Sequence, residues 1–315
     1  MVNMVSKKFD VVVLGELNID LVLWEVPFPE NEKEKLAKDM RFTMGSSSAI
    51  TAHNLAVIGS KVGFIGKCGD DNFGKFMKQG LQTGGVDIGG IVSDTKLKTG
   101  ATIILANPPK KALLTYMGAM TGMKMQDINW EYVKQARHLH MGCFYLQTGL
   151  IPDVAKIFFQ ARSLGLTTSL DTNWDPSEKW SEDLYEILKH TDVFLPNDDE
   201  AIHIAHESTL DKAIEKLRKM VKVLAIKKGK EGTVVCSGLE CFEIPSFAVE
   251  AVETTGAGDS FNAGFLHQFT RGKNLEECAR FGNACGALAV TALGGTGAFQ
   301  DKATVQKRIK EILEG

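Results

Sequence analysis

Short runs of consecutive apolar residues alternate along this chain with longer segments in which apolar residues recur at helical spacing. The apolar runs lie at residues 10–15, 62–66, 193–195 and 223–226, and further strands are suggested at residues 138–144 and 167–170. The helical segments lie at residues 47–58, 74–80, 153–164, 181–190 and 209–221. Continuous apolar runs of this length are typical of parallel strands buried on both faces. The alternation therefore predicts an α/β protein with a mostly parallel central sheet flanked by helices on both faces.

Two segments interrupt this alternation, at about residues 18–45 and 95–120. Both alternate apolar and polar residues without helical periodicity, and residues 102–106 and 112–116 flank the turn-forming sequence Asn107-Pro108-Pro109-Lys110. Such a pattern is typical of a β-hairpin. We therefore expect a small β-sheet lid on a single domain that spans residues 1–315.

Composition narrows the class of protein without identifying it. Hydrophobic residues make up 44% of the chain and charged residues 24%, as in ordinary globular proteins. The net charge of −3 gives no electrostatic reason to expect nucleic acid or an anionic membrane as partner. The six cysteines contain no C-x-x-C pair, and no apolar segment approaches the length of a membrane span. We expect reduced thiols and a cytoplasmic protein.

Residues 253–261, Glu-Thr-Thr-Gly-Ala-Gly-Asp-Ser-Phe, are the most informative stretch of the chain. Gly256, Ala257 and Gly258 precede a helical pattern, so their N–H groups lie where a helix N-terminus favours a phosphate. Asp259 then lies beside that phosphate, where a carboxylate suits a base that orients an attacking hydroxyl. The alternative is a Gly-rich turn with Asp259 as a helix-start charge.

Two further groups of polar residues follow predicted strands. Asn18 and Asp20 point to the same side of an extended segment, and an amide beside a carboxylate suits the hydroxyls of a sugar. The alternative is that Asn18 and Asp20 are ordinary turn formers. Asn197 and Glu200 follow another strand, where the family resemblance given below implies Mg²⁺; one carboxylate is sufficient for this ion because it keeps several waters. The alternative is a helix cap with Asn197 and Glu200 as a capping box.

The nine-residue run resembles the second signature of the PfkB (ribokinase-like) carbohydrate kinase family, and weaker similarity extends over roughly residues 10–300. The resemblance implies a ribokinase-like fold, ATP and Mg²⁺ as cofactors, and in some relatives a monovalent cation such as K⁺. It assigns Asp259 as the catalytic base and the turn before it as an anion hole. It also allows a homodimer formed through the lid.

The same resemblance implies roles for residues elsewhere in the chain. It places Asn18 and Asp20 with Gly45 and Ser46 at the sugar, and Glu200 at Mg²⁺ through water. The residues implied for the nucleotide are Asn197, Lys227, Gly229, Gly232 and Asn283.

The chain departs from the family pattern mainly at the acceptor end. Ser46 replaces the second glycine of the first signature, Ile50 replaces its asparagine, and Asp175 replaces an arginine found in some subfamilies. Glu253 replaces the aspartate that usually begins the second signature. We therefore predict ATP-dependent phosphorylation of a hydroxyl on a small sugar or sugar derivative, with the acceptor left undetermined. A nucleoside kinase of the same fold and a non-catalytic sugar or nucleotide sensor remain alternatives.

Overall fold

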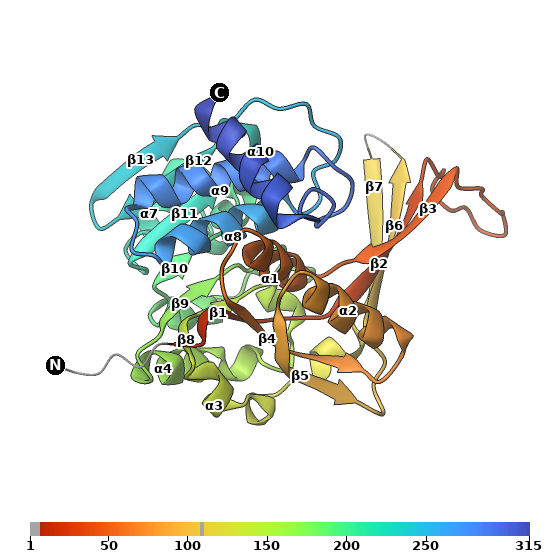
Figure 1. Cartoon of the computed structure of the whole chain (residues 1–315), viewed down its shortest axis with the longest axis horizontal. Helices are drawn as coiled ribbons and strands as arrows, with labels where there is room; N and C mark the ends of the chain where they lie inside the picture. The colour runs from red at the N-terminus through yellow and green to blue at the C-terminus, as the bar shows by residue number, and fades with distance from the viewer. Residues whose placement is uncertain (1–6, 108–109) are drawn as a thin grey trace.

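The computed structural model describes residues 7–107 and 110–315, and it contains two sheets (Figure 1). The larger sheet has nine strands in the order β13-β12-β11-β10-β9-β8-β1-β4-β5. Its strands are β1 (Phe9–Leu14), β4 (Val62–Gly69), β5 (Asp87–Asp94), β8 (Ala136–Met141), β9 (Thr167–Leu170), β10 (Val193–Phe194), β11 (Val223–Lys227), β12 (Thr233–Ser237) and β13 (Glu240–Ile244). All pairings from β11 to β5 are parallel, which confirms the predicted fold class.

Helices cover both faces of this sheet, and the side chains of β1 show why. Val11 and Val13 pack into one buried cluster with α1 (Ser47–Val57), α2 (Asn72–Thr83), α9 (Leu275–Ala289) and α10 (Lys302–Glu314). Val12 and Leu14 point to the opposite face, because successive side chains of a strand alternate. The helices on that face are α3 (Trp130–Val133), α4 (Val154–Ser163), α5 (Asp183–Leu188), α6 (Asp198–Ala205) and α7 (Leu210–Leu217). A continuous apolar run is therefore what this position in the sheet requires.

The edge of the sheet beyond β11 differs from the sequence prediction. Strands β12 and β13 form an antiparallel hairpin, and β12 and β5 were not predicted because neither is a long apolar run. The hairpin places Cys236 directly opposite Cys241, and the two are joined by a disulfide. The expectation that all six cysteines are reduced thiols is therefore wrong for this pair. Their spacing becomes informative only once the hairpin is known.

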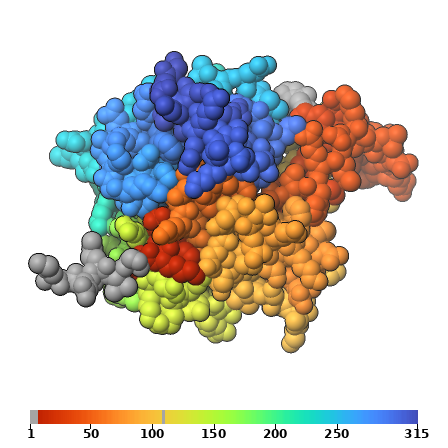
Figure 2. Space-filling view, in the orientation of Figure 1, coloured from red at the N-terminus to blue at the C-terminus, as the bar shows by residue number. Residues whose placement is uncertain are grey.

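The second sheet has the order β3-β2-β6-β7 and projects from the α/β body (Figure 1). We call it the lid sheet. Its strands are β2 (Asn18–Trp24), β3 (Asp39–Met44), β6 (Gly100–Asn107) and β7 (Lys110–Tyr116). Strands β6 and β7 pair antiparallel as the predicted hairpin, although residues 108 and 109 of its turn lie outside the described residues. The part of this sheet near residues 20–45 protrudes in Figure 2.

The lid sheet also exposes apolar side chains, among them Met40, Leu113, Leu114 and Tyr116. The homodimer through the lid stays a prediction. Within residues 7–107 and 110–315, no helix combines the length and the apolar character needed to cross a membrane.

Candidate active site

The carboxyl ends of the parallel strands converge on one large cavity. Glu16 follows β1, Cys143 follows β8, Asn173 follows β9 and Asn197 follows β10, while Lys227 ends β11. All five line a cavity of about 1100 Å³. Open α/β sheets bind ligands at this edge, so the topology alone marks the cavity as a binding site.

The Gly-rich turn lies at the start of α8 (Ala257–Phe269). Gly256 has φ 77°, and a Cβ there would come within 2.5 Å of Gly295 Cα, so only glycine fits without strain. No hydrogen-bond acceptor is found within the described chain for the N–H groups of Gly256 and Gly258. The N–H of Ala257, in contrast, donates to Thr254 O at 3.3 Å. The turn thus offers free N–H donors at a helix N-terminus, as an anion site requires.

Asp259 lies in the first turn of α8 and is only 8% exposed. Helix α1 packs against this turn, and Thr51 Oγ1 donates to Asp259 O at 3.3 Å. Burial, followed by the charges of Asp171 and Glu16, raises the pKa of Asp259 from 3.8 to about 8. A helix-start charge is normally exposed to water, so this buried carboxylate fits the role of a general base better.

Asn18 and Asp20 lie together on β2, as their spacing predicts. Asn18 Nδ2 donates to Asp20 Oδ1 at 3.2 Å and to Thr102 Oγ1 at 3.3 Å. Burial, with the charges of Glu253 and Glu16, raises the pKa of Asp20 to about 7. Both side chains line the large cavity on the side of the lid sheet. They are therefore placed to contact an acceptor hydroxyl.

Gly45 brings the chain close to this pair. A Cβ at residue 45 would lie 2.2 Å from Asp20 Oδ1 and 2.8 Å from Asn18 Nδ2. We expect Gly45→Ala to displace both side chains and to raise the acceptor KM by roughly 10- to 100-fold, since a shift of about 1 Å has effects of this size. Steady-state kinetics with the acceptor varied at saturating nucleotide measures this change.

Gly286→Ala is a matched control in the other half of the site. Gly286 lies on α9 and lines a second cavity, which adjoins the large one and is described below. A Cβ added at residue 286 would have only one close neighbour, Ala257 O at 3.2 Å. We expect it to change the nucleotide KM and to leave the acceptor KM unchanged. An unchanged acceptor KM in Gly45→Ala would contradict the placement of Asn18 and Asp20.

Ser46 and Glu16 hold the start of α1 against this cavity. Ser46 Oγ accepts from Ala49 N at 2.9 Å as the helix cap and donates to Glu16 O at 2.7 Å. The carboxylate of Glu16 accepts from Ser48 N at 3.1 Å and from the Ser48 hydroxyl. Ser46 lines the cavity as predicted, but its hydroxyl is already engaged in capping α1.

Three non-glycine residues around the cavity have left-handed backbone conformations. These are Ser46 with φ 67°, Cys143 with φ 50° and Asn173 with φ 53°. Such conformations cost about 1–3 kcal/mol each and persist where the surrounding structure enforces them, commonly at functional sites. Their grouping around one cavity supports a binding role for it.

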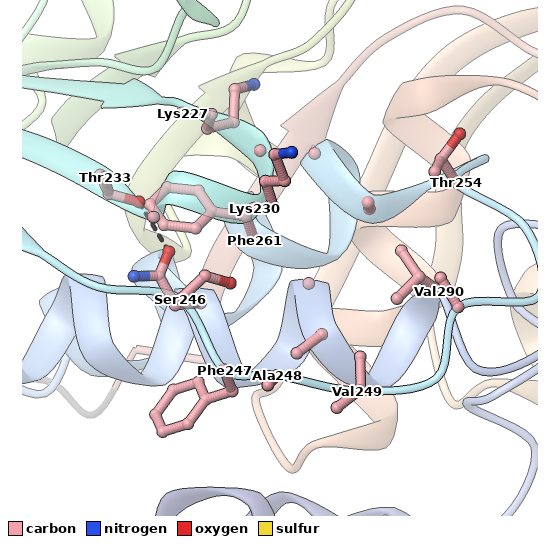
Figure 3. A pocket seen from close by; sticks show the side chains of 18 residues that line it. Lys227, Lys230, Thr233, Ser246, Phe247, Ala248, Val249, Thr254, Phe261 and Val290 are labelled. Carbon is pink, nitrogen blue, oxygen red and sulfur yellow. Dashed lines mark hydrogen bonds between the residues drawn. The ribbon is translucent and has the colours of Figure 1, made fainter.

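A second cavity of about 510 Å³ adjoins the first and lies between the β12–β13 edge and α9 (Figure 3). Gly229, Gly232 and Asn283 line it, as predicted for the nucleotide. In Figure 3, Phe247, Ala248 and Val249 lie on the side opposite Lys227 and Lys230. The other apolar residues that line this cavity are Ala251, Phe261, Ala287 and Val290. A largely apolar slot with few polar groups suits a flat heterocycle.

The side chain of Asn283 is committed to the protein. Its Nδ2 donates to Ile244 O at 3.0 Å and Pro245 O at 3.1 Å, and its Oδ1 accepts from Thr233 Oγ1 at 2.6 Å. Asn283 therefore fixes the wall of this cavity by linking α9 to the end of β13. Asn283 lines this cavity, its role at the nucleotide stays a prediction, and the sequence did not reveal this structural role.

Lys227 lies where the two cavities meet. Both cavities are lined by Lys227, Gly229, Thr254 and Gly258. Lys227 Nζ lies 2.7 Å from Asp171 Oδ2. Burial opposes the charged form of Lys227, but the carboxylates of Asp171 and Glu200 outweigh it and raise the pKa of this lysine. The junction thus holds a charged ammonium beside the Gly-rich turn.

Asn197 and Glu200 form the capping box that was the structural alternative for them. Asn197 Oδ1 accepts from Glu200 N at 2.8 Å, and Glu200 Oε2 accepts from Asn197 N at 2.9 Å. Both residues nevertheless line the large cavity, and burial together with the charge of Asp171 raises the pKa of Glu200 to about 7. One carboxylate oxygen therefore serves the cap, which leaves the other for a ligand.

Two further departures from the family pattern, Glu253 and Asp175, have structural roles. Glu253 accepts from Gly294 N at 2.8 Å and from the Thr255 hydroxyl at 2.5 Å, so it links two loops next to Asp20. Asp175 accepts from Ser177 N at 2.8 Å and Trp180 N at 2.9 Å. Neither carboxylate belongs to the large cavity.

Sequence reasoning did not assign roles to Glu16 and Asp171. Glu16 lines the cavity and is 1% exposed, and Asp171, also 1% exposed, pairs with Lys227. The sequence nevertheless contained an indication of a role in ligand binding, because each residue follows the carboxyl end of a buried parallel strand. The contacts that give them a role, to Ser48 and Lys227, are distant in sequence.

The fold and this site define a phosphotransferase of the kinase type, and comparison with known proteins names its family. Residues 8–302 match the pfkB family of carbohydrate kinases, so the chain belongs to that family. It is accordingly a carbohydrate kinase whose acceptor is a sugar or a nucleoside.

Relatives that are named for different acceptors have nearly the same sequence identity to this chain. Probable fructokinase-5 from Arabidopsis thaliana is 29% identical to this chain in an alignment that covers 95% of this chain and 97% of the relative. A nucleoside kinase from Methanothermobacter thermautotrophicus is 28% identical, covering 96% of each. The solved structure of Arabidopsis thaliana ribokinase with ribose and ATP is 24% identical, covers 96% of this chain and 99% of that chain, and superposes with a TM-score of 0.84. That structure has the same ribokinase-like fold.

Proposed function

We propose that this protein transfers the γ-phosphoryl group of ATP to a hydroxyl of a small sugar or sugar derivative. One observation carries the proposal: two cavities of different character meet at the Gly256–Gly258 turn, with the buried carboxylate of Asp259 beside it. The apolar cavity suits the adenine, and the polar one suits the acceptor. A phosphate chain that joins them passes the free N–H groups of the turn.

In this proposal the residues have distinct roles. Asp259 orients the acceptor hydroxyl and takes its proton. The N–H groups of Gly256 and Gly258 stabilise negative charge on the transferring phosphoryl group, and that of Ala257 joins them if it leaves Thr254 O. Asn18 and Asp20 hold the other hydroxyls. Closure of the lid sheet excludes water and limits wasteful ATP hydrolysis.

The donor set at the edge of the cavity fits Mg²⁺. Within the part of the chain that the structure describes, no three His, Cys, Asp or Glu side chains form a metal cage. Asn197, Asp198, Asp199 and Glu200 nevertheless place oxygen atoms along the cavity. Mg²⁺ is commonly held by one or two carboxylates, waters and phosphates, and when bound it neutralises phosphate charge. Glu200 is the residue that we expect to hold it, through water.

We expect Glu200→Gln to raise the Mg²⁺ concentration needed for half-maximal activity by roughly 10-fold. Glutamine keeps a carbonyl oxygen for the Asn197 N–H, so the capping box is preserved while the charge is lost. The control is Glu277→Gln, which makes the same change in the Asn274–Glu277 capping box at the start of α9. A similar Mg²⁺ dependence in both variants would show that Glu200 acts only as a cap.

ATP consumption measured across neutral sugars, sugar acids and nucleosides tests the function itself. Turnover that depends on an acceptor is expected, and its absence with every acceptor favours the sensor. A preference for nucleosides favours the alternative activity, which the apolar residues Ile104, Leu113 and Trp174 in the acceptor cavity also support.

A further inference from the structure

We propose that the acceptor carries no anionic group, because the charge and lining of the large cavity exclude sugar acids and sugar phosphates. This inference rests on the proposed function and narrows its substrate. It is argued from the half of the cavity away from residues 197–200, between Asp259 and the lid sheet, which we call the acceptor half.

Three carboxylates line the acceptor half. Glu16, Asp20 and Asp259 are 1%, 9% and 8% exposed, and within residues 7–107 and 110–315 none forms an ion pair. Glu253 lies close enough to Asp20 for its charge to act on it. Near pH 7 the raised pKa values leave Asp20 and Asp259 partly protonated, but the proposed reaction needs Asp259 ionised. An anionic acceptor would bring like charge against these groups and would disfavour that ionised form. Neutral hydroxyls, in contrast, donate hydrogen bonds to carboxylates.

Two lysines and no arginine line the cavity among the described residues. Lys227 is paired with Asp171 at 2.7 Å and lies at the junction with the nucleotide side. Lys111 is exposed on β7 and pairs with Ala106 near the outer end of the lid sheet. An exposed ammonium group is screened by water and salt, so it offers a bound anion little attraction. Lys227 acts on Asp259 from the junction, but Asp171 already pairs with it. Among the described residues, the acceptor half therefore has no unpaired buried cation to offset its carboxylates.

The amide donors of this half are also engaged. Asn18 Nδ2 donates to Asp20, and Asn173 Nδ2 donates to Ser47 Oγ at 2.6 Å. The hydroxyls of Ser47, Thr102 and Thr115 in this wall already form hydrogen bonds with protein side chains. The apolar residues of the wall are Ile50, Ile104, Leu113, Met117, Leu146 and Trp174. A carboxylate or phosphate placed there would lose hydration without gaining a partner, which is costly.

The test compares matched acceptors with and without an anionic group. The pairs are fructose with its 1- and 6-phosphates, ribose with its 1- and 5-phosphates, and sorbitol with gluconate. Using both phosphates leaves every reactive hydroxyl free in at least one of them. We expect the anionic members to have kcat/KM values at least about 100-fold below the neutral ones. An anionic member whose kcat/KM equals that of its neutral partner would overturn this inference but not the proposed function. No turnover with any acceptor would overturn the proposed function and the inference with it.

A pair of variants on β7 tests the cause. Leu113 lines the cavity, whereas its neighbour Leu114 points to the other face of the lid sheet and does not. Leu113 is itself 53% exposed, so we expect Leu113→Lys to raise the ratio of anionic to neutral kcat/KM only about 2- to 5-fold at low salt and less at high salt. Leu114→Lys is expected to leave the ratio unchanged. Equal ratios in the wild type and in both variants would contradict an electrostatic origin of the selection.

Discussion

Asp259→Asn is expected to lower kcat by about 10²–10⁴-fold while nucleotide binding stays at the wild-type level. Asparagine has nearly the same shape as aspartate but cannot take a proton from the acceptor hydroxyl. The reaction then loses its base, whereas the Gly-rich turn and the apolar cavity are unchanged. Turnover from a coupled ATP assay and nucleotide affinity from calorimetry are the measurements.

The pH dependence of the wild-type enzyme follows from the same residue. The pKa of Asp259 is raised to about 8, and only the ionised form acts as a base. We therefore expect log kcat/KM to rise with unit slope up to about pH 8 and to level off above it. A profile that is flat from pH 5 to pH 9 would contradict this assignment.

Stability provides an independent readout of Asp259. Between pH 3.8 and about 8 the folded state keeps a proton that the unfolded state releases, so this group makes the protein less stable as pH rises. Asp259→Asn removes that loss and should be more stable than the wild type at pH 9, with little difference at pH 3. Asp301→Asn, at the exposed start of α10, is the control for a helix-start charge and should leave turnover unchanged.

Asp171→Asn is expected to lower the free energy of unfolding by about 3 kcal/mol. Breaking a buried ion pair typically costs 3–5 kcal/mol because the remaining charge has no partner. The lower end applies here, since Glu200 and Asp259 still act on the ammonium of Lys227. Asn262 also donates to Asp171, and asparagine retains an oxygen for this bond. Chemical denaturation at pH 7 measures the loss.

A double-mutant cycle separates the ion pair from other effects. Adding Lys227→Met to Asp171→Asn removes the orphaned charge and keeps a side chain of similar length, so we expect the double variant to recover at least half of the loss. If the effects of the two single variants simply add, the pair is not coupled. Glu311→Gln breaks the exposed pair with Lys307 on α10 and should cost less than about 0.5 kcal/mol.

Local patterns predicted most of the fold because buried strands and amphipathic helices have characteristic periods. The run at residues 10–15 corresponds to β1, and the segment at residues 167–170 coincides with β9. Two strands escaped prediction. Strand β5 lies at an edge of the sheet and is only partly buried, whereas β12 is buried but contains only a short apolar run. The disulfide depends on the hairpin that β12 and β13 form, so it was hidden in the same way.

The sequence by itself predicted an anion site with an adjacent carboxylate at residues 253–261, because glycine and aspartate there need only a local helix start, which α8 supplies. It also placed Asn18 beside Asp20, since both lie on one strand. Only the tertiary structure decided the partners of Asp171 and Glu16 and the charge of the acceptor half. These depend on contacts between strand ends that are far apart in the chain. Burial at this edge of the sheet likewise raises the pKa values of Asp20, Glu200 and Asp259, which residue type alone does not reveal.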